Sequence, residues 1–429
     1  MQVNTEQKNI VILGGGFGGV RVALDLSWRI PSGYQIILID QRGYHLMHWI
    51  LYEIATVYLK HISRFDYEAV EGASAILFGD IFKGTNVKFL QGRVSDVFLP
   101  DKVLGIEFPD YRDPAKNEPA LSGLIKYEYL VMALGSETNY FGIKGLREAA
   151  YGLKDLNDSL NVRDALEELF AGKGVDDNIN IVVGGGGFTG VEFSGELVGY
   201  VKKLAEKYQL SPKRVHISVV EAGKCLLPGA KDWLIAAATK RLSRLGIHLV
   251  LESPIEKYEQ GQIFLAGGRI MPADLLIWTA GVRANTLMDH LAGVDLTKTC
   301  LMVNDALQIP QHPEVFGIGD NVYCFNPAKG CPVPATAQRA VDQGRVVANN
   351  IARLIEGKSL VAYKPRDPAF IVPIGGKYAL ADIYGVQLEG VIAWWAKMLV
   401  GLKYLLSILP VSRAIRLWWA GLFIWVSND

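Results

Sequence analysis

The sequence is poor in cysteine and carries no excess of charge of either sign, and each shortage argues against a class of protein. Only four of the 429 residues are cysteines, and no two form a Cys-x-x-Cys pair, so neither a disulfide scaffold nor a zinc-ribbon or thioredoxin-type site is expected. The 44 basic residues are balanced by 44 acidic ones without a long basic run, which argues against a nucleic-acid partner. Hydrophobic residues make up 50% of the chain, too many for intrinsic disorder, and the length allows two or three domains.

Signals for metal binding and for export are missing as well. His45, His48 and His61 are too irregularly spaced for a His-x-x-x-His motif and no carboxylate cluster accompanies them, so no metal is predicted. Residues 1–8 are polar and show neither the apolar core of a secretion signal nor the Arg/Ser bias of an organelle transit peptide. We therefore expect a cytoplasmic chain, from a bacterium rather than an organelle.

The first glycine cluster follows a short apolar run, residues 9–13, that is predicted to be a buried strand, and it precedes a helix-like run. Gly14, Gly16 and Gly19 have the Gly-x-Gly-x-x-Gly spacing of a dinucleotide-binding turn. The first glycine makes the tight turn, the second lets a pyrophosphate approach the backbone, and the third lets helix and strand pack closely. Asp40 ends the next strand, 21 residues after Gly19, where its carboxylate is placed to accept hydrogen bonds from a ribose.

The second glycine cluster repeats this pattern after another strand-like run, residues 180–183. Gly185, Gly187 and Gly190 have the same spacing, and the acidic residue at the end of the next strand is Glu221. It lies 31 residues past Gly190, because the intervening helix is long. A carboxylate there favours two free ribose hydroxyls and repels a 2′-phosphate, so we expect NADH rather than NADPH.

A chain with two dinucleotide-binding folds typically carries FAD on the first and binds NAD(P)H on the second, so that a hydride can pass between them. Residues 313–320, Pro-Glu-Val-Phe-Gly-Ile-Gly-Asp, resemble the second flavin fingerprint of the two-dinucleotide flavoprotein superfamily. That resemblance implies that Asp320 binds the ribitol chain of FAD. The predicted fold is therefore α/β, with two Rossmann-like domains and a C-terminal amphipathic helical region. Its parts are an FAD-binding domain in residues 1–149 and 286–365, an NADH-binding domain in residues 150–285, and a membrane-association region in residues 366–429.

Five further blocks carry a more specific resemblance, and they lie at residues 43–56, 133–142, 190–197, 278–283 and 337–344. In these blocks the chain resembles the type II NADH:quinone oxidoreductases, which are single-subunit NADH dehydrogenases that do not pump protons. The resemblance implies that a hydride passes from NADH to FAD and that two electrons then pass to a membrane quinone.

The last of these blocks reads Ala-Gln-Arg-Ala-Val-Asp-Gln-Gly, where the family has Ala-Gln-x-Ala-x-Gln-Gln-Gly and lines its quinone site. Gln338 and Gln343 match this pattern. Asp342 stands where a glutamine is expected, and a carboxylate there could alternatively supply protons to a quinol. Glu192, two residues past Gly190, is expected beside the nicotinamide, where it orients the ring or handles protons; the alternative is an acid that stabilises the helix dipole.

The expected site residues fall into three sets. The catalytic set is Glu192, Gln338, Asp342 and Gln343. The FAD-binding set is Gly14, Gly16, Phe17, Gly18, Gly19, Asp40, Gln41, Ala133, Gly135, Asp320 and Ala337. The NADH-binding set is Gly185, Gly187, Phe188, Thr189, Gly190, Glu221 and Gly281.

Two alternatives stay open at this point. One is an NAD(P)H-dependent flavoreductase with another acceptor, of the ferredoxin, rubredoxin or sulfide:quinone type. The other is a membrane-bound redox-sensing flavoprotein with negligible turnover. The cysteines bear on the first. No cysteine precedes Cys225, whereas disulfide reductases of the superfamily carry a close pair on the helix after the first strand. Cys324 and Cys331 both come from one loop, so we interpret them as ordinary thiols rather than the pair that sulfide oxidation needs.

The C-terminal end is rich in tryptophan, with five of the nine tryptophans in the last 36 residues. Residues 391–409 are predicted to form a helix with one broad apolar face and with Lys397, Lys403 and Ser407 on the opposite side. A second apolar helix follows, but the longest charge-free run, residues 417–428, is shorter than the roughly 20 residues that a spanning helix needs. We therefore expect residues 391–426 to lie among lipid headgroups, peripherally, on the cytoplasmic face of a bacterial cell membrane. The alternative is a core-covering or dimerisation helix, and a homodimer is left open.

Overall fold

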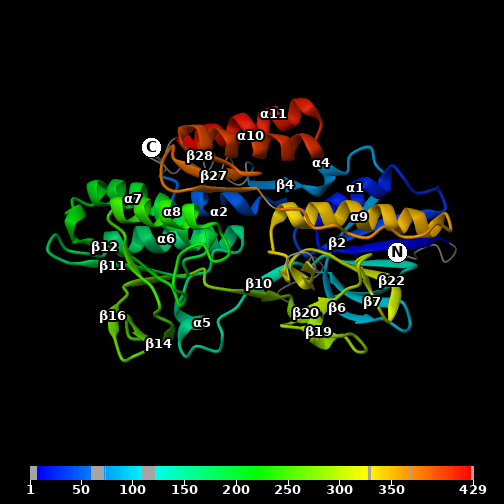
Figure 1. Ribbon diagram of the computed structural model, residues 1–429, viewed down its shortest axis with the longest axis horizontal. Coiled ribbons are helices and arrows are strands. Elements are labelled where there is room, and N and C mark those ends of the chain that lie inside the picture. Colours follow the sequence, from blue (N-terminus) through cyan, green and yellow to red (C-terminus); the bar gives the residue numbers. More distant parts are fainter. Residues whose placement is uncertain are drawn as a thin grey trace. The chain divides into compact units, whose positions relative to one another are not determined.

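The computed structural model describes residues 7–58, 72, 74–108, 121–326, 330–367 and 369–426 (Figure 1). The chain forms two compact units, each assembled from three segments. The first unit comprises Met1–His45, Ile76–Glu137 and Val282–Asp367, and the second comprises Leu46–Ala75, Thr138–Gly281 and Pro368–Asp429. The third histidine considered above, His61, lies outside the described residues.

The first unit is built on a six-stranded sheet with the order β21-β22-β9-β1-β2-β5. All neighbouring strands are parallel except β21 and β22. The central strand has almost no exposed residue, as expected for a parallel strand covered on both faces. The strands are β1 (Lys8–Leu13), β2 (Tyr34–Asp40), β5 (Val87–Gln91), β9 (Tyr129–Met132), β21 (Gln308–Ile309) and β22 (His312–Gly317).

The two faces of this sheet are covered differently. Helices α1 (Phe17–Ser27) and α9 (Ala337–Ile355) pack against each other beside the sheet, and the other face contributes Val11 and Leu13 to an apolar core. That core also includes Leu104 and Ile106 from an antiparallel sheet. The strands of this antiparallel sheet are β6 (Arg93–Phe98), β7 (Val103–Phe108) and β8 (Leu121–Lys126). The smaller elements of the unit are α4 (Phe78–Ile81), η4 (Thr286–His290), η5 (Gly319–Asn321), β19 (Leu296–Thr297), β20 (Cys300–Met302), β23 (Val322–Tyr323), β24 (Phe325–Asn326) and β25 (Cys331–Pro332).

The second unit is built on a four-stranded parallel sheet with the order β13-β12-β11-β17. Its strands and helices are β11 (Ile179–Gly184), β12 (Val215–Val220), β13 (His248–Val250), β17 (Leu275–Trp278), α2 (Leu51–Ile54), α5 (Leu146–Ala149), α6 (Leu156–Ala171), α7 (Phe188–Lys207), α8 (Asp232–Arg244), η1 (His48–Ile50) and η3 (Pro212–Arg214). A separate antiparallel sheet is formed by β14 (Ile255–Glu259), β15 (Gln262–Leu265) and β16 (Ile270–Pro272).

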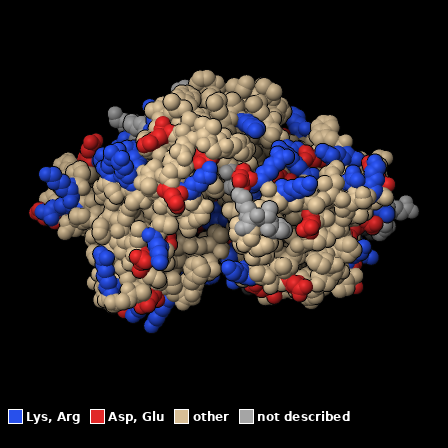
Figure 2. Space-filling model, in the orientation of Figure 1, with Lys and Arg blue, Asp and Glu red and all other residues tan. Residues whose placement is uncertain are grey.

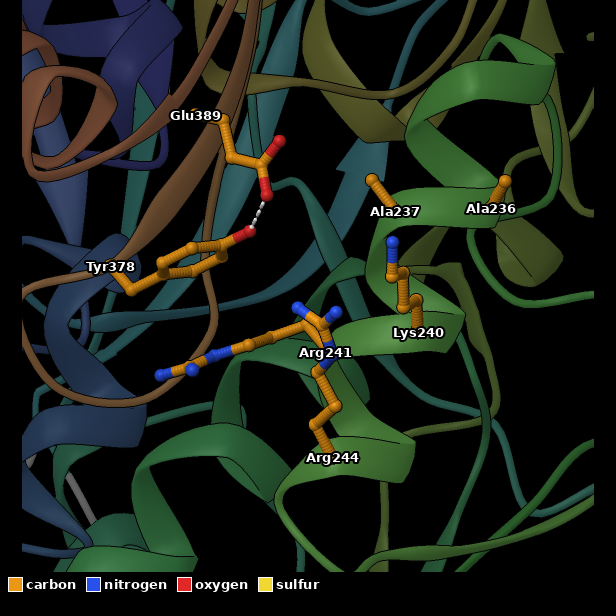
Figure 3. Close-up of a pocket in the computed structure, with 7 residues that line it drawn as sticks. All are labelled: Ala236, Ala237, Lys240, Arg241, Arg244, Tyr378 and Glu389. Carbon is orange, nitrogen blue, oxygen red and sulfur yellow. Dashed lines mark hydrogen bonds between the residues drawn. The ribbon is translucent and has the colours of Figure 1, made fainter.

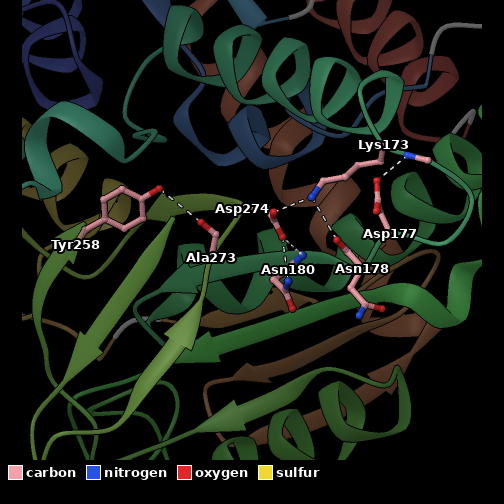
Figure 4. A network of polar contacts seen from close by, with 8 residues as sticks. Lys173, Asp177, Asn178, Asn180, Tyr258, Ala273 and Asp274 are labelled. Carbon is pink, nitrogen blue, oxygen red and sulfur yellow. Dashed lines mark hydrogen bonds and ion pairs between the residues drawn. The ribbon is translucent and has the colours of Figure 1, made fainter. Parts of the chain in front are cut away.

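A polar network holds the beginnings of β11 and β17 together in this unit (Figure 4). The carboxylate of Asp274 accepts hydrogen bonds from the backbone amide of Asn180 at 2.7 Å and from its side-chain amide at 2.9 Å. Lys173 follows α6 in the chain, and its ammonium group lies 2.8 Å from the other oxygen of Asp274. One carboxylate thus joins a helix end to two neighbouring strands.

The C-terminal segment of the second unit consists of an antiparallel sheet and two helices: β26 (Phe370–Pro373), β27 (Ala379–Ile383), β28 (Val386–Gly390), α10 (Val391–Ile408) and α11 (Val411–Val426). Ala393, Trp394 and Met398 of α10 pack on Ala379 and Ala381 of β27. By length and composition α10 is the one helix, among the described residues, that could cross a membrane. Part of it is covered by the sheet, however, so lipid cannot surround it completely.

The structure confirms the predicted fold class, since both Rossmann-like sheets and the C-terminal helices form where the sequence placed them. The second compact unit includes two segments that the sequence analysis assigned elsewhere. Residues 46–75 were expected in the FAD-binding domain, and residues 366–429 were expected to form a separate region. The domain boundaries themselves stay a prediction. Two short strand pairs lie where the chain passes between the units: β3 (Tyr44–Leu46) with β4 (Ala75–Leu77), and β10 (Ser136–Thr138) with β18 (Val282–Ala284).

Candidate active site

The first glycine turn leaves its outer side open. Gly14 has a φ of +100°, and a side chain there would place its Cβ 2.3 Å from the carbonyl oxygen of Ala133. A Cβ on Gly19 would lie only 1.9 Å from the carbonyl oxygen of Gly14, so helix and strand can meet only at a glycine. A Cβ on Gly16, by contrast, would meet nothing within 4 Å. Because Gly16 precedes α1 and the first turn of α1 has no acidic residue, the free amides of this helix end face open space and fit a diphosphate.

The carboxylate at the end of β2 holds this turn in place. The amide of Gly15 donates to Oδ2 of Asp40 at 2.7 Å, and the amide of Arg42 donates to Oδ1 at 2.8 Å. Asp40 is 9% exposed, so the carboxylate is nearly buried at the mouth of the turn. This arrangement fits the predicted role in binding a ribose, which stays a prediction. Gln41, the next residue, is exposed, and its carbonyl accepts a hydrogen bond from the side chain of Gln91.

A buried histidine, His45, supports the same turn; the sequence analysis considered it as a metal ligand and also included it in the family-like block at residues 43–56. The Nδ1 atom of His45 lies 2.9 Å from the carbonyl oxygen of Gly15, and the imidazole stands edge-on to the Phe17 ring at a centroid distance of 5.0 Å. Burial lowers the pKa of His45 to about 4, so the ring is neutral at neutral pH and Nδ1 carries the donated proton. The signal for this role was the Tyr-His pair in the block at residues 43–56.

The second flavin fingerprint contacts the end of β9 and the segment after it through three hydrogen bonds. The Ser136 hydroxyl donates to Asp320 at 2.8 Å, and the Gly135 amide donates to Oδ1 of Asn321 at 3.1 Å. The Asn321 side chain in turn donates to the carbonyl of Met132 at 3.0 Å. The structure therefore brings together two predicted FAD-binding positions, Gly135 and Asp320, and adds Asn321, which the sequence analysis did not single out.

Helix α9 lies tightly against α1 because both helices have a glycine at the contact. A Cβ on Gly344 would lie 2.8 Å from the carbonyl oxygen of Gly18, and a Cβ on Gly18 would lie 3.1 Å from the carbonyl oxygen of Ala340. The Thr336 side chain caps α9 by accepting a hydrogen bond from the Arg339 amide. The beginning of α9, with Ala337 and Gln338, is thereby fixed within the first unit.

The three residues expected at the quinone have different surroundings. Gln343 is fully buried, and its side-chain oxygen accepts a hydrogen bond from the Gly319 amide at 2.8 Å, which supports the turn before Asp320. Asp342 forms an ion pair with Arg345 on the surface of the helix, at 3.1 Å. Gln338 is half-buried, and within the described part of the chain its side chain makes no hydrogen bond. Of the three, Gln338 is therefore the most available to a ligand, and all three roles stay predictions.

The second glycine turn reproduces the first in the other unit. Gly185 has a φ of +111°, and a Cβ on Gly190 would lie 2.0 Å from the carbonyl oxygen of Gly185, whereas a Cβ on Gly187 would meet nothing within 4 Å. The amide of Gly186 donates to Oε2 of Glu221 at 2.6 Å. A carboxylate thus holds each of the two glycine turns at the same amide.

Three further predicted NADH positions lie around this turn. Phe188 begins α7 and stacks on Phe370 at a centroid distance of 5.2 Å, and Thr189 beside it is exposed. A Cβ on Gly281 would lie 2.5 Å from the ring of Phe141, so this glycine admits an aromatic side chain.

A cluster of ionisable side chains surrounds Glu192 in the second unit. Burial raises the pKa of Glu192 to about 8; the positive charge of Lys397 opposes this shift, and the carboxylates of Glu53 and Glu196 add to it. Glu192 is therefore protonated at neutral pH. The sequence analysis missed Glu53 and placed Lys397 among cations facing lipid headgroups. That placement was wrong, because the Lys397 side chain is 13% exposed and its ammonium lies 2.5 Å from Oε1 of Glu53.

All four cysteines are free, and burial raises the pKa of the Cys300 and Cys324 thiols, which keeps them protonated at neutral pH. Cys324 and Cys331 lie on or beside the β24–β25 hairpin, where Cys331 pairs with Asn326. Over the described ranges, no group of three or more His, Cys, Asp or Glu residues is placed to hold a metal ion, and the absence of a metal stays a prediction.

Comparison with known proteins places these features in a family. The chain is 27% identical to the type II NADH:quinone oxidoreductase of Staphylococcus haemolyticus over 422 residues, covering 96% of this chain and 98% of the relative. It is 29% identical to the protein of the same name from Haemophilus influenzae over 399 residues, covering 88% and 87%. These names confirm the resemblance seen in the sequence.

Solved structures agree on the fold. A structure of NDH2 from Plasmodium falciparum in complex with NADH superimposes with a TM-score of 0.79 at 18% identity, covering 98% of this chain and 97% of that one. The sulfide:quinone oxidoreductase from Aquifex aeolicus gives 0.73 at 19% identity, covering 93% and 91%. The family model described as pyridine nucleotide-disulphide oxidoreductase matches residues 8–344. Since this match spans most of the chain, the chain belongs to the pyridine nucleotide-disulphide oxidoreductase family.

Proposed function

We propose that this protein is a membrane-associated NADH:quinone oxidoreductase that uses FAD and does not pump protons. The observation that carries the proposal is the presence of two open glycine turns of the same build, each held by a carboxylate at the end of the next strand. Two dinucleotides therefore fit on one chain, and curated relatives of nearly the same length carry the name of this activity. FAD, when bound, accepts a hydride from NADH and passes two electrons to a quinone.

The first unit fits FAD. The open side of Gly16 and the free amides of α1 would receive the diphosphate, and Asp40 would bind the adenosine ribose. Asp320, held by the Ser136 hydroxyl, would bind the ribitol chain. Residues 1–149 and 286–365 form the FAD-binding domain in this proposal, and residues 150–285 form the NADH-binding domain.

The second unit fits NADH over NADPH. Both oxygens of Glu221 accept backbone hydrogen bonds, from Gly186 at 2.6 Å and from Gly223 at 2.7 Å, so the carboxylate is fixed beside the turn. A fixed negative charge there accepts hydrogen bonds from ribose hydroxyls and repels a 2′-phosphate. The protonated carboxyl group of Glu192 would orient the carboxamide of the nicotinamide or hold a proton for the reaction.

The quinone is the proposed acceptor, and Gln338 is the proposed contact. Its half-buried amide can donate to a quinone carbonyl, while Gln343 positions the Gly319 turn. Sulfide as donor is not favoured, because the two cysteines of the β24–β25 region come from one hairpin and no cysteine precedes Cys225 in the chain.

The C-terminal helices are the proposed membrane contact. Ile392, Trp395 and Leu399 of α10 and Trp419 of α11 are exposed, at 68%, 47%, 58% and 53%. The surface over α10 and α11 is mostly free of charged side chains in the face that Figure 2 shows. Apolar patches of this kind mark interaction surfaces, and quinones reside in lipid. We propose peripheral attachment to the cytoplasmic face of a bacterial cell membrane; self-association stays a prediction.

Stopped-flow spectroscopy of the purified yellow protein tests the function. NADH is expected to bleach the flavin absorption, and a pulse of a short-chain quinone is expected to restore it. Bleaching without restoration by quinone would favour another acceptor. Absence of bleaching would leave a redox-sensing flavoprotein.

A further inference from the structure

We propose that a basic pocket in the second unit binds the phosphate group of an anionic glycerophospholipid, such as phosphatidylglycerol. The inference rests on the proposed membrane association and specifies the lipid chemistry. The pocket, of about 240 Å³, lies between α8 and the strands that precede α10 (Figure 3). Lys240, Arg241 and Arg244 line it from α8, and Tyr378 and Glu389 line it from the other side.

The pocket carries three cations against one carboxylate, and that carboxylate is already engaged. Glu389 accepts a hydrogen bond from the hydroxyl of Tyr378 (Figure 3). Lys240 and Arg244 are both exposed and lie four residues apart on one helix face, where like charges repel each other. Within the described residues, neither side chain forms an ion pair. An anion in the pocket would relieve this repulsion.

The third cation is held in a fixed position. The Nε atom of Arg241 donates to the carbonyl of Ile374 at 3.1 Å, and Nη2 donates to the carbonyl of Gly375 at 3.1 Å. Its guanidinium lies 4.3 Å from the centroid of the Tyr378 ring. Arg241 is thus pre-organised as one wall of the pocket, and Lys240 and Arg244 provide flexible charged groups at the rim. This combination suits a phosphate, which accepts several charge-assisted hydrogen bonds at once.

The position of the pocket argues for a lipid phosphate rather than a soluble one. Glu389 lies on β28, which leads directly into α10. The first two residues of α10, Val391 and Ile392, are 54% and 68% exposed. An apolar face that enters the acyl region therefore begins beside the pocket. The other end of this 18-residue helix, about 27 Å away, is followed by Arg413 and Arg416 of α11, which are exposed. Cations thus flank the apolar face at both ends, as expected for a surface that rests on headgroups.

Vesicle co-sedimentation with the full-length, FAD-loaded protein tests the proposal. The pocket variant is the double substitution Lys240→Gln and Arg244→Gln, and the matched control is Lys202→Gln with Lys213→Gln, which removes two exposed charges of the same unit outside the pocket. We expect the pocket variant to bind vesicles of phosphatidylcholine with phosphatidylglycerol roughly tenfold or more weakly than the parent. The control variant is expected to change less than about twofold, and binding to pure phosphatidylcholine is expected to be the same for all three proteins.

Two results would overturn the proposal. Equal losses in the pocket and control variants would mean that net charge alone drives binding. Binding of millimolar inorganic phosphate by the parent but not by the pocket variant in the absence of vesicles, together with unchanged vesicle binding of the pocket variant, would mean that the pocket takes free phosphate instead. NADH oxidation with a short-chain quinone, measured without vesicles, is expected to be equal in all three proteins, so failure of the proposed function would be seen separately.

Discussion

The ammonium group of Lys397 lies 2.5 Å from the carboxylate of Glu53, a residue 344 positions earlier in the chain. It also donates to the hydroxyl of Tyr52, which itself donates to Glu53 at 2.8 Å. The two charged side chains are only 13% and 8% exposed. This buried pair ties α10, the proposed membrane helix, to α2 within the second unit.

Removing one partner of this ion pair is expected to destabilise the folded protein. Lys397→Met should lower the free energy of unfolding by about 3–5 kcal/mol, because it leaves the Glu53 carboxylate buried without a counter-charge. Chemical denaturation at pH 7 provides the measurement. The double variant Glu53→Gln with Lys397→Met should recover much of the loss, since no uncompensated charge remains. A Lys403→Met control, which removes an exposed cation of the same helix, should change stability by less than about 0.5 kcal/mol.

This contact also shows what could and could not be predicted from the sequence. The glycine spacings and the acids at the strand ends are local patterns, so both dinucleotide turns and their carboxylates were predictable. The periodicity of residues 391–409 predicted an apolar helix. It did not show that Trp394 and Met398 face the β26–β28 sheet while Trp395 and Leu399 are exposed, because the predicted apolar face is broad enough to hold all four residues and does not define which part of it is buried.

The inward orientation of Lys397 was unpredictable for a related reason, because its partner comes from a distant part of the chain. The same holds for Gln343. The family resemblance of the block at residues 337–344 implied a ligand contact for Gln343, whereas its hydrogen bond to Gly319 depends on how α9 folds back onto the fingerprint.

The proton affinity of Glu192 predicts a specific pH dependence. Its pKa of about 8 lies above the ordinary value of 4.5, so the folded protein holds a proton that the unfolded chain has released between these two values. The contribution of this residue to stability is therefore fully favourable below pH 4.5 and decreases as the pH rises towards 8. Glu192→Gln should match the parent in acid and exceed its stability above pH 8, as measured by thermal unfolding.

If Glu192 acts in its protonated form, its titration should also affect the pH dependence of kcat/KM for NADH. We expect kcat/KM for NADH to fall with an inflection near pH 8 in the parent, and this inflection should disappear in Glu192→Gln. Glu206→Gln, an exposed position near the end of α7, is the control and should leave the profile unchanged. An inflection that persists in Glu192→Gln would assign it to another group.

Gly16 and Gly19 of the first turn allow ligand binding and folding to be tested separately. Gly16→Ala places a methyl group in open space where the diphosphate is expected, so it should weaken FAD binding by roughly tenfold or more and leave the apoprotein stability nearly unchanged. Gly19→Ala drives a methyl group to 1.9 Å from the Gly14 carbonyl and should destabilise the apoprotein by about 1–3 kcal/mol or more. Flavin fluorescence titration and denaturation of the apoprotein measure the two effects. If Gly16→Ala binds FAD as tightly as the parent, the open side of the turn is not the diphosphate site.

Two glutamines of α9 are expected to behave differently. Gln338→Ala should slow the restoration of flavin absorption by quinone and spare its bleaching by NADH, with stability within about 0.5 kcal/mol of the parent, because its side chain is half-buried. Gln343→Ala should lower the free energy of unfolding by about 1–3 kcal/mol, because it leaves the Gly319 amide without its buried acceptor. Stopped-flow traces and denaturation curves distinguish the two. Equal slowing of both half-reactions in Gln338→Ala would indicate a structural role for that residue as well.

The buried imidazole under the first turn makes the protein sensitive to acid. His45 has a pKa of about 4, below the 6.5 of the unfolded chain, so between these values the unfolded chain takes up a proton that the folded protein excludes. Stability should therefore be fully present above pH 6.5 and decrease as the pH falls towards 4, with a total loss of about 3 kcal/mol from this residue. His45→Gln, which keeps a donor for the Gly15 carbonyl but does not titrate, should flatten the dependence of the unfolding free energy on pH in this range. His290→Gln removes an exposed histidine of the same unit and should leave the slope nearly unchanged. An unaltered slope in His45→Gln would mean that other groups cause the acid sensitivity.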